Sequence, residues 1–320
     1  AEYSLNFNKA FGSFNIIAMF GGSATRSTYN RDGIRGDQLL IPFYHVITNA
    51  GQLYTNVSNS KSGINSLYGS AEASYKDLVY LTVTGRNDWF STLAPKNNSI
   101  FYPSVGLSYL LHNQITFPEW WSFAKIRTSY AEVGGGSSAY ATKIGYNFDA
   151  TGYLSTPLVS LPDGIANPNL LPYETSEWEV GFDFRFFKNR IGVDYAYYNK
   201  KTTNDIVGVT LPQSSGYTSA TVNLGAIGNK GHELMLTLIP VSGKINLEFN
   251  LAYSYNMGEI LDLGGVSEVN AGNVGIGGGI DVKHIVGVRP YALYGYTQKK
   301  IDGKPVWERW TFNYAGQAHQ

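Results

Sequence analysis

The strongest constraint in this sequence is a strict two-residue alternation of apolar and polar side chains. It is clearest between Trp178 and Tyr198, where the chain reads WEVGFDFRFFKNRIGVDYAYY. Two alternating runs are separated by a short polar break at residues 188–190. Because successive side chains of a β-strand point to opposite faces, this pattern predicts two strands joined by a tight turn, each with one apolar and one polar face.

The same alternation recurs along most of the chain. Further alternating runs lie at 3–8, 14–20, 67–75, 79–86, 105–109, 124–130, 234–238 and 245–256. The breaks near residues 11, 76, 112, 188 and 242 are short, whereas those at 25–65, 87–100, 132–171, 200–220 and from 258 onward are long. Short and long breaks alternate. In an up-and-down antiparallel sheet every second connection lies at the same end, so the pattern predicts about ten strands with tight turns at one end and long loops at the other.

Composition and loop asymmetry together favour a membrane barrel. Charged residues make up 15% of the chain, against roughly 25% in soluble proteins. The longest apolar run, Ile16 to Phe20, is far shorter than the ~18 residues of a membrane-spanning helix. A soluble β-sandwich buries its apolar face, and its loops need not sort by length. A transmembrane barrel turns its apolar face to lipid, encloses a polar lumen, and has short periplasmic turns and long outer loops. We therefore predict an all-β fold: a transmembrane antiparallel up-and-down β-barrel of the bacterial outer membrane.

The barrel topology assigns the charged residues of the opening stretch. Alternate residues from Trp178 to Phe186 are predicted to face lipid. The predicted lumen-facing residues are Glu177, Glu179, Asp183 and Arg185. The three carboxylates repeat about 6–7 Å apart along the strand, near the separations that glycosidases use. A lumen wall carries charges in any case, so we predict no catalytic residues and no enzyme.

Neither metals nor nucleic acid are indicated as partners. The five histidines are scattered without metal-ligand spacing, and cysteine is absent. Oxygen ligands at Asn30, Asp32 and Asp37 would suit a structural Ca²⁺ ion in an outer loop, but their order does not match an EF-hand, and a plain turn is the simpler interpretation. Lys plus Arg and Asp plus Glu both number 24, which gives no electrostatic reason to expect nucleic acid.

Aromatic residues in the long breaks are the candidates for substrate contact. Exposed rings stack on sugars or on peptide side chains and provide contact area at low entropic cost. The candidates are Trp89, Phe90, Tyr140, Tyr146, Tyr153 and Tyr217. Packing of the loops against one another is the alternative role for these rings.

Several motifs occur in an order that resembles the SusC/RagA type of TonB-dependent outer-membrane transporter. The resemblance covers most of residues 66–258, with departures at Ala131 and Pro172, where the family usually has other residues. The motifs are Arg86–Asp88, Tyr102–Val105, Lys125–Tyr130, Asn167–Leu170, Glu177–Phe182, Asp194–Thr202, Leu211–Pro212, Asn223–Gly225 and Asn229–Leu234.

The resemblance implies an arc of a larger barrel and a transport function. Family barrels have about 22 strands and hold an N-terminal plug, so residues 1–320 would form a partial barrel domain, with the plug and the C-terminal strands outside this chain. The resemblance further implies import of an oligosaccharide or a peptide, a SusD-like surface lipoprotein as partner, and energy from the TonB complex through the plug. A passive porin, a structural barrel in an outer-membrane assembly and a soluble carbohydrate-active enzyme are the alternatives.

Overall fold

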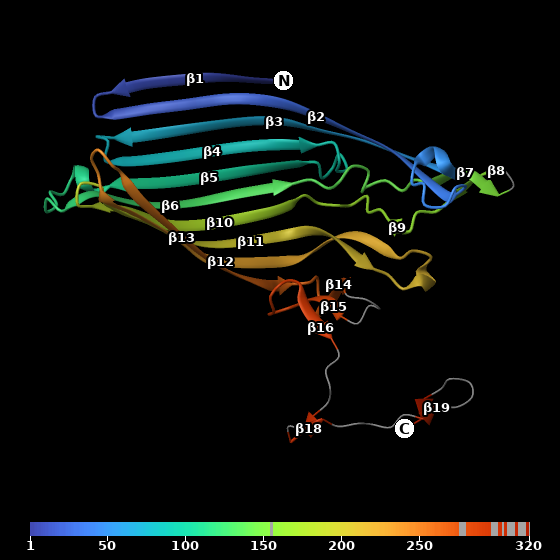
Figure 1. The fold of residues 1–320 in the computed structure, drawn as a ribbon. Helices are drawn as coiled ribbons and strands as arrows, with labels where there is room; N and C mark the ends of the chain where they lie inside the picture. Colours follow the sequence, from blue (N-terminus) through green and yellow to red (C-terminus); the bar gives the residue numbers. More distant parts are fainter. Residues whose placement is uncertain are drawn as a thin grey trace.

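The fold is dominated by one large antiparallel sheet. The computed structural model describes residues 1–153, 156–274, 280–295, 300–302, 304–305, 311–312 and 318–319. The sheet has the strand order β1-β2-β3-β4-β5-β6-β10-β11-β12-β13, so ten strands follow one another as they do in the chain (Figure 1). Their bounds are Glu2–Phe11, Phe14–Leu39, Ala50–Tyr75, Val79–Phe90, Ser99–Leu110, Trp121–Gly135, Tyr173–Phe186, Ile191–Thr210, Ser219–Val241 and Leu247–Asp262. The predicted all-β, up-and-down antiparallel fold of about ten strands is confirmed, as an open arc.

Smaller elements belong to the connections. β7 (Asn147–Tyr153) pairs with β8 (Thr156–Ser160), and β9 (Gly164–Ile165) runs parallel to the start of β12. Beyond β13 a separate three-stranded sheet consists of β14 (Glu268–Val274), β15 (Ile280–Ile285) and β16 (Ala292–Gly295). The remaining elements are the two-residue strands β17 (Lys300–Ile301), β18 (Lys304–Pro305), β19 (Thr311–Phe312) and β20 (Ala318–His319), and the 3-10 turns η1 (Ile47–Asn49), η2 (Leu111–Asn113) and η3 (Gln213–Ser215). Among the described residues no helix is long and apolar enough to cross a bilayer.

The tight turns gather at one end of the sheet, and β7, β8 and the β2–β3 tip lie at the other (Figure 1). The turn between β10 and β11 shows how a short polar break folds. Phe187, Lys188 and Asn189 all have positive φ, between 53° and 65°. The backbone N–H of Lys188 donates to Ser122 Oγ at 2.8 Å, so the turn is tied to the start of β6. This hydrogen bond offsets part of the cost of left-handed backbone at non-glycine residues.

Two of the long breaks are strands rather than loops, which corrects the sequence-based boundaries. β2 and β3 are each 26 residues long, so most of 25–65 is a two-stranded ribbon with its tip at 40–49. β3 first pairs with β4 at Ile64, so the ribbon stands beyond the sheet. Within 200–220, β11 continues to Thr210 and β12 begins at Ser219. Two paired strands satisfy each other's backbone groups whatever their side chains, so they need no apolar alternation.

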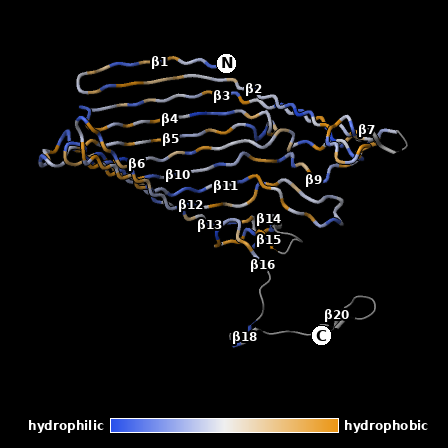
Figure 2. Tube along the Cα trace, in the orientation of Figure 1, coloured by the Kyte–Doolittle hydropathy of each residue, from blue (hydrophilic) through white to orange (hydrophobic). Residues whose placement is uncertain are grey.

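The sheet has one apolar and one polar face. Hydrophobic and hydrophilic residues alternate along the strands (Figure 2), and the ladder aligns the alternation between neighbours: Phe182 pairs with Ile126 on one side and Tyr195 on the other. Among the described residues nothing covers the apolar face, since Leu5 is 72% and Leu251 62% exposed. The described residues bury only one small apolar cluster of Phe90, Leu93 and Leu170, which lies under the loops.

A cluster of large aromatic rings lies on the apolar face at the turn end. Trp121 contacts Phe184 and Phe186 with ring centroids 5.4 and 5.5 Å apart, and Trp120 stacks on Phe186 at 5.9 Å. Aromatic rings gather in this way at the two membrane–water interfaces of barrels, where an apolar body and a polar edge are both satisfied.

Candidate functional site

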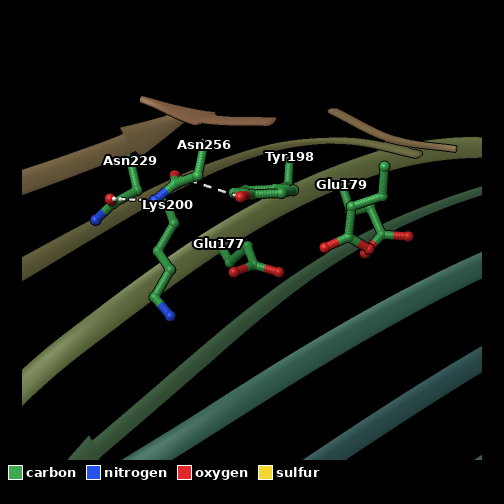
Figure 3. A pocket seen from close by; sticks show the side chains of 7 residues that line it. Glu177, Glu179, Tyr198, Lys200, Asn229 and Asn256 are labelled. Carbon is green, nitrogen blue, oxygen red and sulfur yellow. Dashed lines mark hydrogen bonds between the residues drawn. The ribbon is translucent and has the colours of Figure 1, made fainter. Parts of the chain in front are cut away.

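The candidate site is a cavity on the polar face of β10 to β13. It has a volume of about 410 Å³, and four neighbouring strands supply its side chains (Figure 3). The ladder brings them together, because Glu177 pairs with Lys200, and Lys200 pairs with Asn229. The lining residues are Glu177, Glu179, Tyr198, Lys200, Asn229, Glu233 and Asn256.

A chain of hydrogen bonds crosses the floor of this cavity. The Tyr198 hydroxyl donates to Asn256 Oδ1 at 3.3 Å, and Asn256 Nδ2 donates to Asn229 Oδ1 at 3.4 Å (Figure 3). Tyr198 reaches from β11 to β13 by crossing Gly231 of β12. A Cβ at Gly231 would lie 2.5 Å from the Tyr255 carbonyl oxygen and would also meet the Tyr198 ring. Glycine at this position is therefore what lets the tyrosine lie flat across the middle strand.

An arginine on β6 ties the same face together beside the cavity. Arg127 donates from Nη2 and Nη1 to the two carboxylate oxygens of Asp194, at 2.8 and 3.3 Å, and from Nε to Glu179 Oε1 at 3.3 Å. To reach Asp194 on β11 the guanidinium passes over Gly181 of β10, where a Cβ would lie 3.1 Å from Arg127 Cζ. A bidentate pair of this kind fixes geometry as well as charge.

The chemistry that these groups offer is hydrogen bonding to a polar solute. Within the described residues Glu177, Glu233 and Lys200 form no ion pair, so their charges are available to water or to a solute. Amide and phenol groups beside them donate and accept hydrogen bonds. The described residues hold no group of three or more His, Cys, Asp or Glu side chains close enough to bind a metal ion.

The four charged residues singled out in the sequence share this polar face. Glu177 and Glu179 line the cavity, and Arg185 Nη2 lies 3.2 Å from Asp183 Oδ2 and over the Phe123 ring. Sequence reasoning missed Arg127, Asp194 and the Tyr198–Asn256–Asn229 chain. The alternation places each of these on the polar face, but only the cross-strand register shows which of them meet.

The loop aromatics have different surroundings from one another. Tyr140 is 55% and Tyr146 72% exposed, Trp89 is 36% exposed, and Tyr217 is half-buried. Phe90 is only 7% exposed, because it packs against Leu93 and Leu170 beneath the 136–172 connection, so its expected exposure is wrong. The side chain of Tyr153 lies outside the described residues.

The oxygen ligands considered for calcium do not form a turn. Asn30, Asp32 and Gly33 lie within β2 and pair with β3. Asp37 accepts a hydrogen bond from Arg35 Nε at 3.0 Å, and this hydrogen bond lowers the pKa of the Asp37 carboxyl. The predicted turn at 30–33 is wrong, because the strands of the ribbon continue past it.

An amphipathic antiparallel meander with an uncovered apolar face and a charged opposite face defines the wall of an outer-membrane β-barrel. Comparison with known proteins identifies the family. Residues 1–319 match the family described as "TonB dependent receptor-like, beta-barrel", and the chain belongs to it. This confirms the predicted outer-membrane location and the predicted resemblance.

Curated relatives agree with the family. The chain is 32% identical over 293 residues to TonB-dependent receptor P26 of Formosa agariphila, covering 84% of this chain and 28% of that protein. It is 25% identical over 335 residues to TonB-dependent receptor SusC of Bacteroides thetaiotaomicron, covering 95% of this chain and 32% of SusC. The chain thus spans about a third or less of these relatives.

Solved structures share the fold. The chain aligns to the RagAB peptide transporter with a TM-score of 0.76 and 19% identity, covering 95% of this chain and 36% of that one. It aligns to the closed-closed state of the RagAB peptide importer with a TM-score of 0.75 and 18% identity, covering 99% of this chain and 36% of that one. These relatives and neighbours are receptors and transporters, not enzymes.

Proposed function

We propose that this chain forms part of the barrel wall of a transporter that imports a bulky polar nutrient, an oligosaccharide or a peptide, across the outer membrane. The observation that carries the proposal is the opposite character of the two faces of one sheet. The apolar face, with Leu5 and Leu251 exposed, would contact lipid. The face that bears Glu177, Asp183 and Arg127 would line the lumen.

The charged face suits a polar solute. A passing sugar or peptide exchanges water hydrogen bonds for those of carboxylates, amides and phenols, so such a wall lowers the cost of desolvation. The exposed rings of Tyr140 and Tyr146 in the outer connection would meet the solute first. RagAB is named as a peptide importer, which supports a peptide as the solute. The resemblance to the SusC/RagA type supports an oligosaccharide as well.

The energy source and the partner proteins in this proposal are inferred from the family resemblance. A TonB-dependent system requires a plug that contacts the TonB complex, and the SusC/RagA type works with a SusD-like surface lipoprotein. The TonB complex and the lipoprotein would both act on the full-length protein. A passive porin would use the same wall without either.

The test is uptake by cells that carry the full-length protein. Fluorescently labelled oligosaccharides and oligopeptides are offered to the wild type, to a strain that lacks the protein and to a strain that lacks TonB. If the import proposal is correct, one substrate class accumulates in the wild type but not in the strain that lacks the protein or in the strain that lacks TonB. Uptake that is lost with the protein but persists without TonB would establish the porin instead. Affinity purification of the tagged protein should also recover a surface lipoprotein, and its repeated absence would count against that partner.

A further inference from the structure

A second cavity lies at the loop end of the sheet, on the other face. It has a volume of about 400 Å³ and lies between the base of the β2–β3 ribbon and the β4–β5 connection. Two cationic side chains, Arg26 and Lys61, line it beside the indole of Trp89, and no acidic residue does. The other lining residues are polar or small, apart from Phe90: Ser62, Gly63, Asn65, Ser91 and Asn98.

The arginine of this cavity is held in place by neutral groups. Arg26 Nη1 donates to the carbonyl oxygens of Thr25 and Ile64 at 2.8 and 3.3 Å, and Nη2 donates to Asn65 Oδ1 at 2.8 Å. Its cross-strand partner is Gly63, where a Cβ would lie 3.0 Å from Arg26 Cδ, so the side chain rests on bare backbone. Among the described residues neither Arg26 nor Lys61 forms an ion pair. The guanidinium is thus oriented while its charge stays uncompensated, which suits an anion.

The register places this cavity on the same face as the apolar side chains. Arg26 follows Phe20 by six residues along β2, and the ladder between β2 and β3 has no bulge there. Trp89 follows Val83 by six residues along β4, again without a bulge. An even spacing keeps side chains on one face of a strand. A solute in a lumen on the polar face would have the backbone of the sheet between itself and this cavity.

The depth of the cavity corresponds to the edge of the apolar band. Phe101, 60% exposed, pairs with Asn87, two residues before Trp89. Two residues of strand span about 7 Å, so the cavity begins about 7 Å beyond Phe101, the last large apolar side chain that β5 places on this face. The headgroup layer on each side of the hydrocarbon is about 5–8 Å thick. Tryptophan is enriched at this depth, and basic pockets there bind lipid headgroups.

We infer that Arg26 and Lys61, beside Trp89, form a binding site for the phosphate of a lipid headgroup in the outer leaflet. Arg26 Nε donates to no acceptor among the described residues, and it is free to donate to a phosphate oxygen. Lys61 supplies a second charge, and the indole would pack on the sugar or glycerol that carries the phosphate. The inference rests on the proposal that the apolar face contacts lipid.

The test is lipid binding to the purified full-length protein, followed by native mass spectrometry in detergent. The probes are monophosphoryl lipid A, the same lipid with its phosphate removed, and inorganic phosphate. The double variant Arg26→Gln/Lys61→Gln is compared with Lys9→Gln/Lys76→Gln. This control removes two charges at the turn end, where Lys9 and Lys76 lie over the rings of Phe11 and Tyr75.

The dissociation constant for monophosphoryl lipid A should rise at least tenfold in the Arg26/Lys61 variant, since a charge-assisted hydrogen bond is worth about tenfold or more. It should change less than twofold in the control, and removal of the phosphate should weaken binding to the wild type to the level of the variant. Equal affinity of wild type and variant would overturn the site. Inorganic phosphate that binds as tightly as the lipid would show a site for soluble anions and overturn the lipid assignment.

Failure of this inference can be told apart from failure of the import proposal. Membrane assembly of each variant is measured in parallel. Normal assembly and uptake without phosphate-dependent lipid binding reject only the headgroup site. If the apolar face does not contact lipid, a variant that carries a charge in the middle of that face will instead assemble normally.

Discussion

A charge placed on the apolar face near mid-membrane should strongly destabilise the inserted protein, and Val180→Arg tests this. Val180 lies six residues before Phe186, which belongs to the aromatic cluster at the turn end. Six residues span about 20 Å of strand, and a tilt of about 40° makes this about 15 Å along the membrane normal. The apolar band of a barrel is about 25 Å tall, so Val180 lies near its middle.

The expected cost follows from this depth. Arginine on a lipid face at the midplane costs about 2–4 kcal/mol, which is roughly a 30- to 700-fold change in the folding equilibrium. Two control variants lie on the opposite face. Ser129→Arg adds the same side chain beside Glu179, its cross-strand partner. Asp183→Asn removes only a partly exposed ion pair with Arg185, worth about 0–1 kcal/mol.

The assay is reversible unfolding of the full-length protein from lipid vesicles with guanidinium chloride, monitored by tryptophan fluorescence. Val180→Arg should lower the free energy of unfolding by the amount given, and both controls should change it by less than about 1 kcal/mol. Equal losses for Val180→Arg and Ser129→Arg would refute the assignment of the two faces.

Three further predictions concern packing and topology. Leu170→Ala should destabilise the 136–172 connection by about 2–5 kcal/mol because Leu170 is fully buried, and backbone hydrogen exchange in the connection should become faster. Leu171→Ala, at a 41% exposed position, is the control. Equal exchange rates in the two variants would contradict the packing. Protease added to intact cells should cut within 136–172 and spare 187–190, and the reverse pattern would invert the topology. Gly181→Ala should cost about 1–3 kcal/mol, since its Cβ would lie 2.6 Å from a carbonyl oxygen of the next strand; an unchanged midpoint in guanidinium chloride would show that the strands adjust.

Strand segments could be predicted because alternation is a local property of the chain. The run from Trp178 to Tyr198 contains two strands and their turn, and the structure confirms the limits at the turn, Phe186 and Ile191, whereas β10 begins earlier, at Tyr173, and β11 continues to Thr210. Strand length could not be predicted for β2 and β3. The residues of their ribbon lack an apolar face, and what makes them strands is the pairing with each other.

The alternation of apolar and polar side chains in the sequence determined by itself that the sheet has an apolar and a polar face, because successive side chains of a strand point to opposite faces. Only the tertiary structure decided which residues meet across strands. Arg127, Glu179 and Asp194 lie on three different strands and come together through the register and a glycine between them. Phe90 and Trp89 are neighbours in sequence, yet Phe90 packs against Leu93 and Leu170 beneath a loop and is 7% exposed, whereas Trp89 is 36% exposed. Which residues of different strands become neighbours depends on long-range pairing, and local sequence patterns do not encode this pairing.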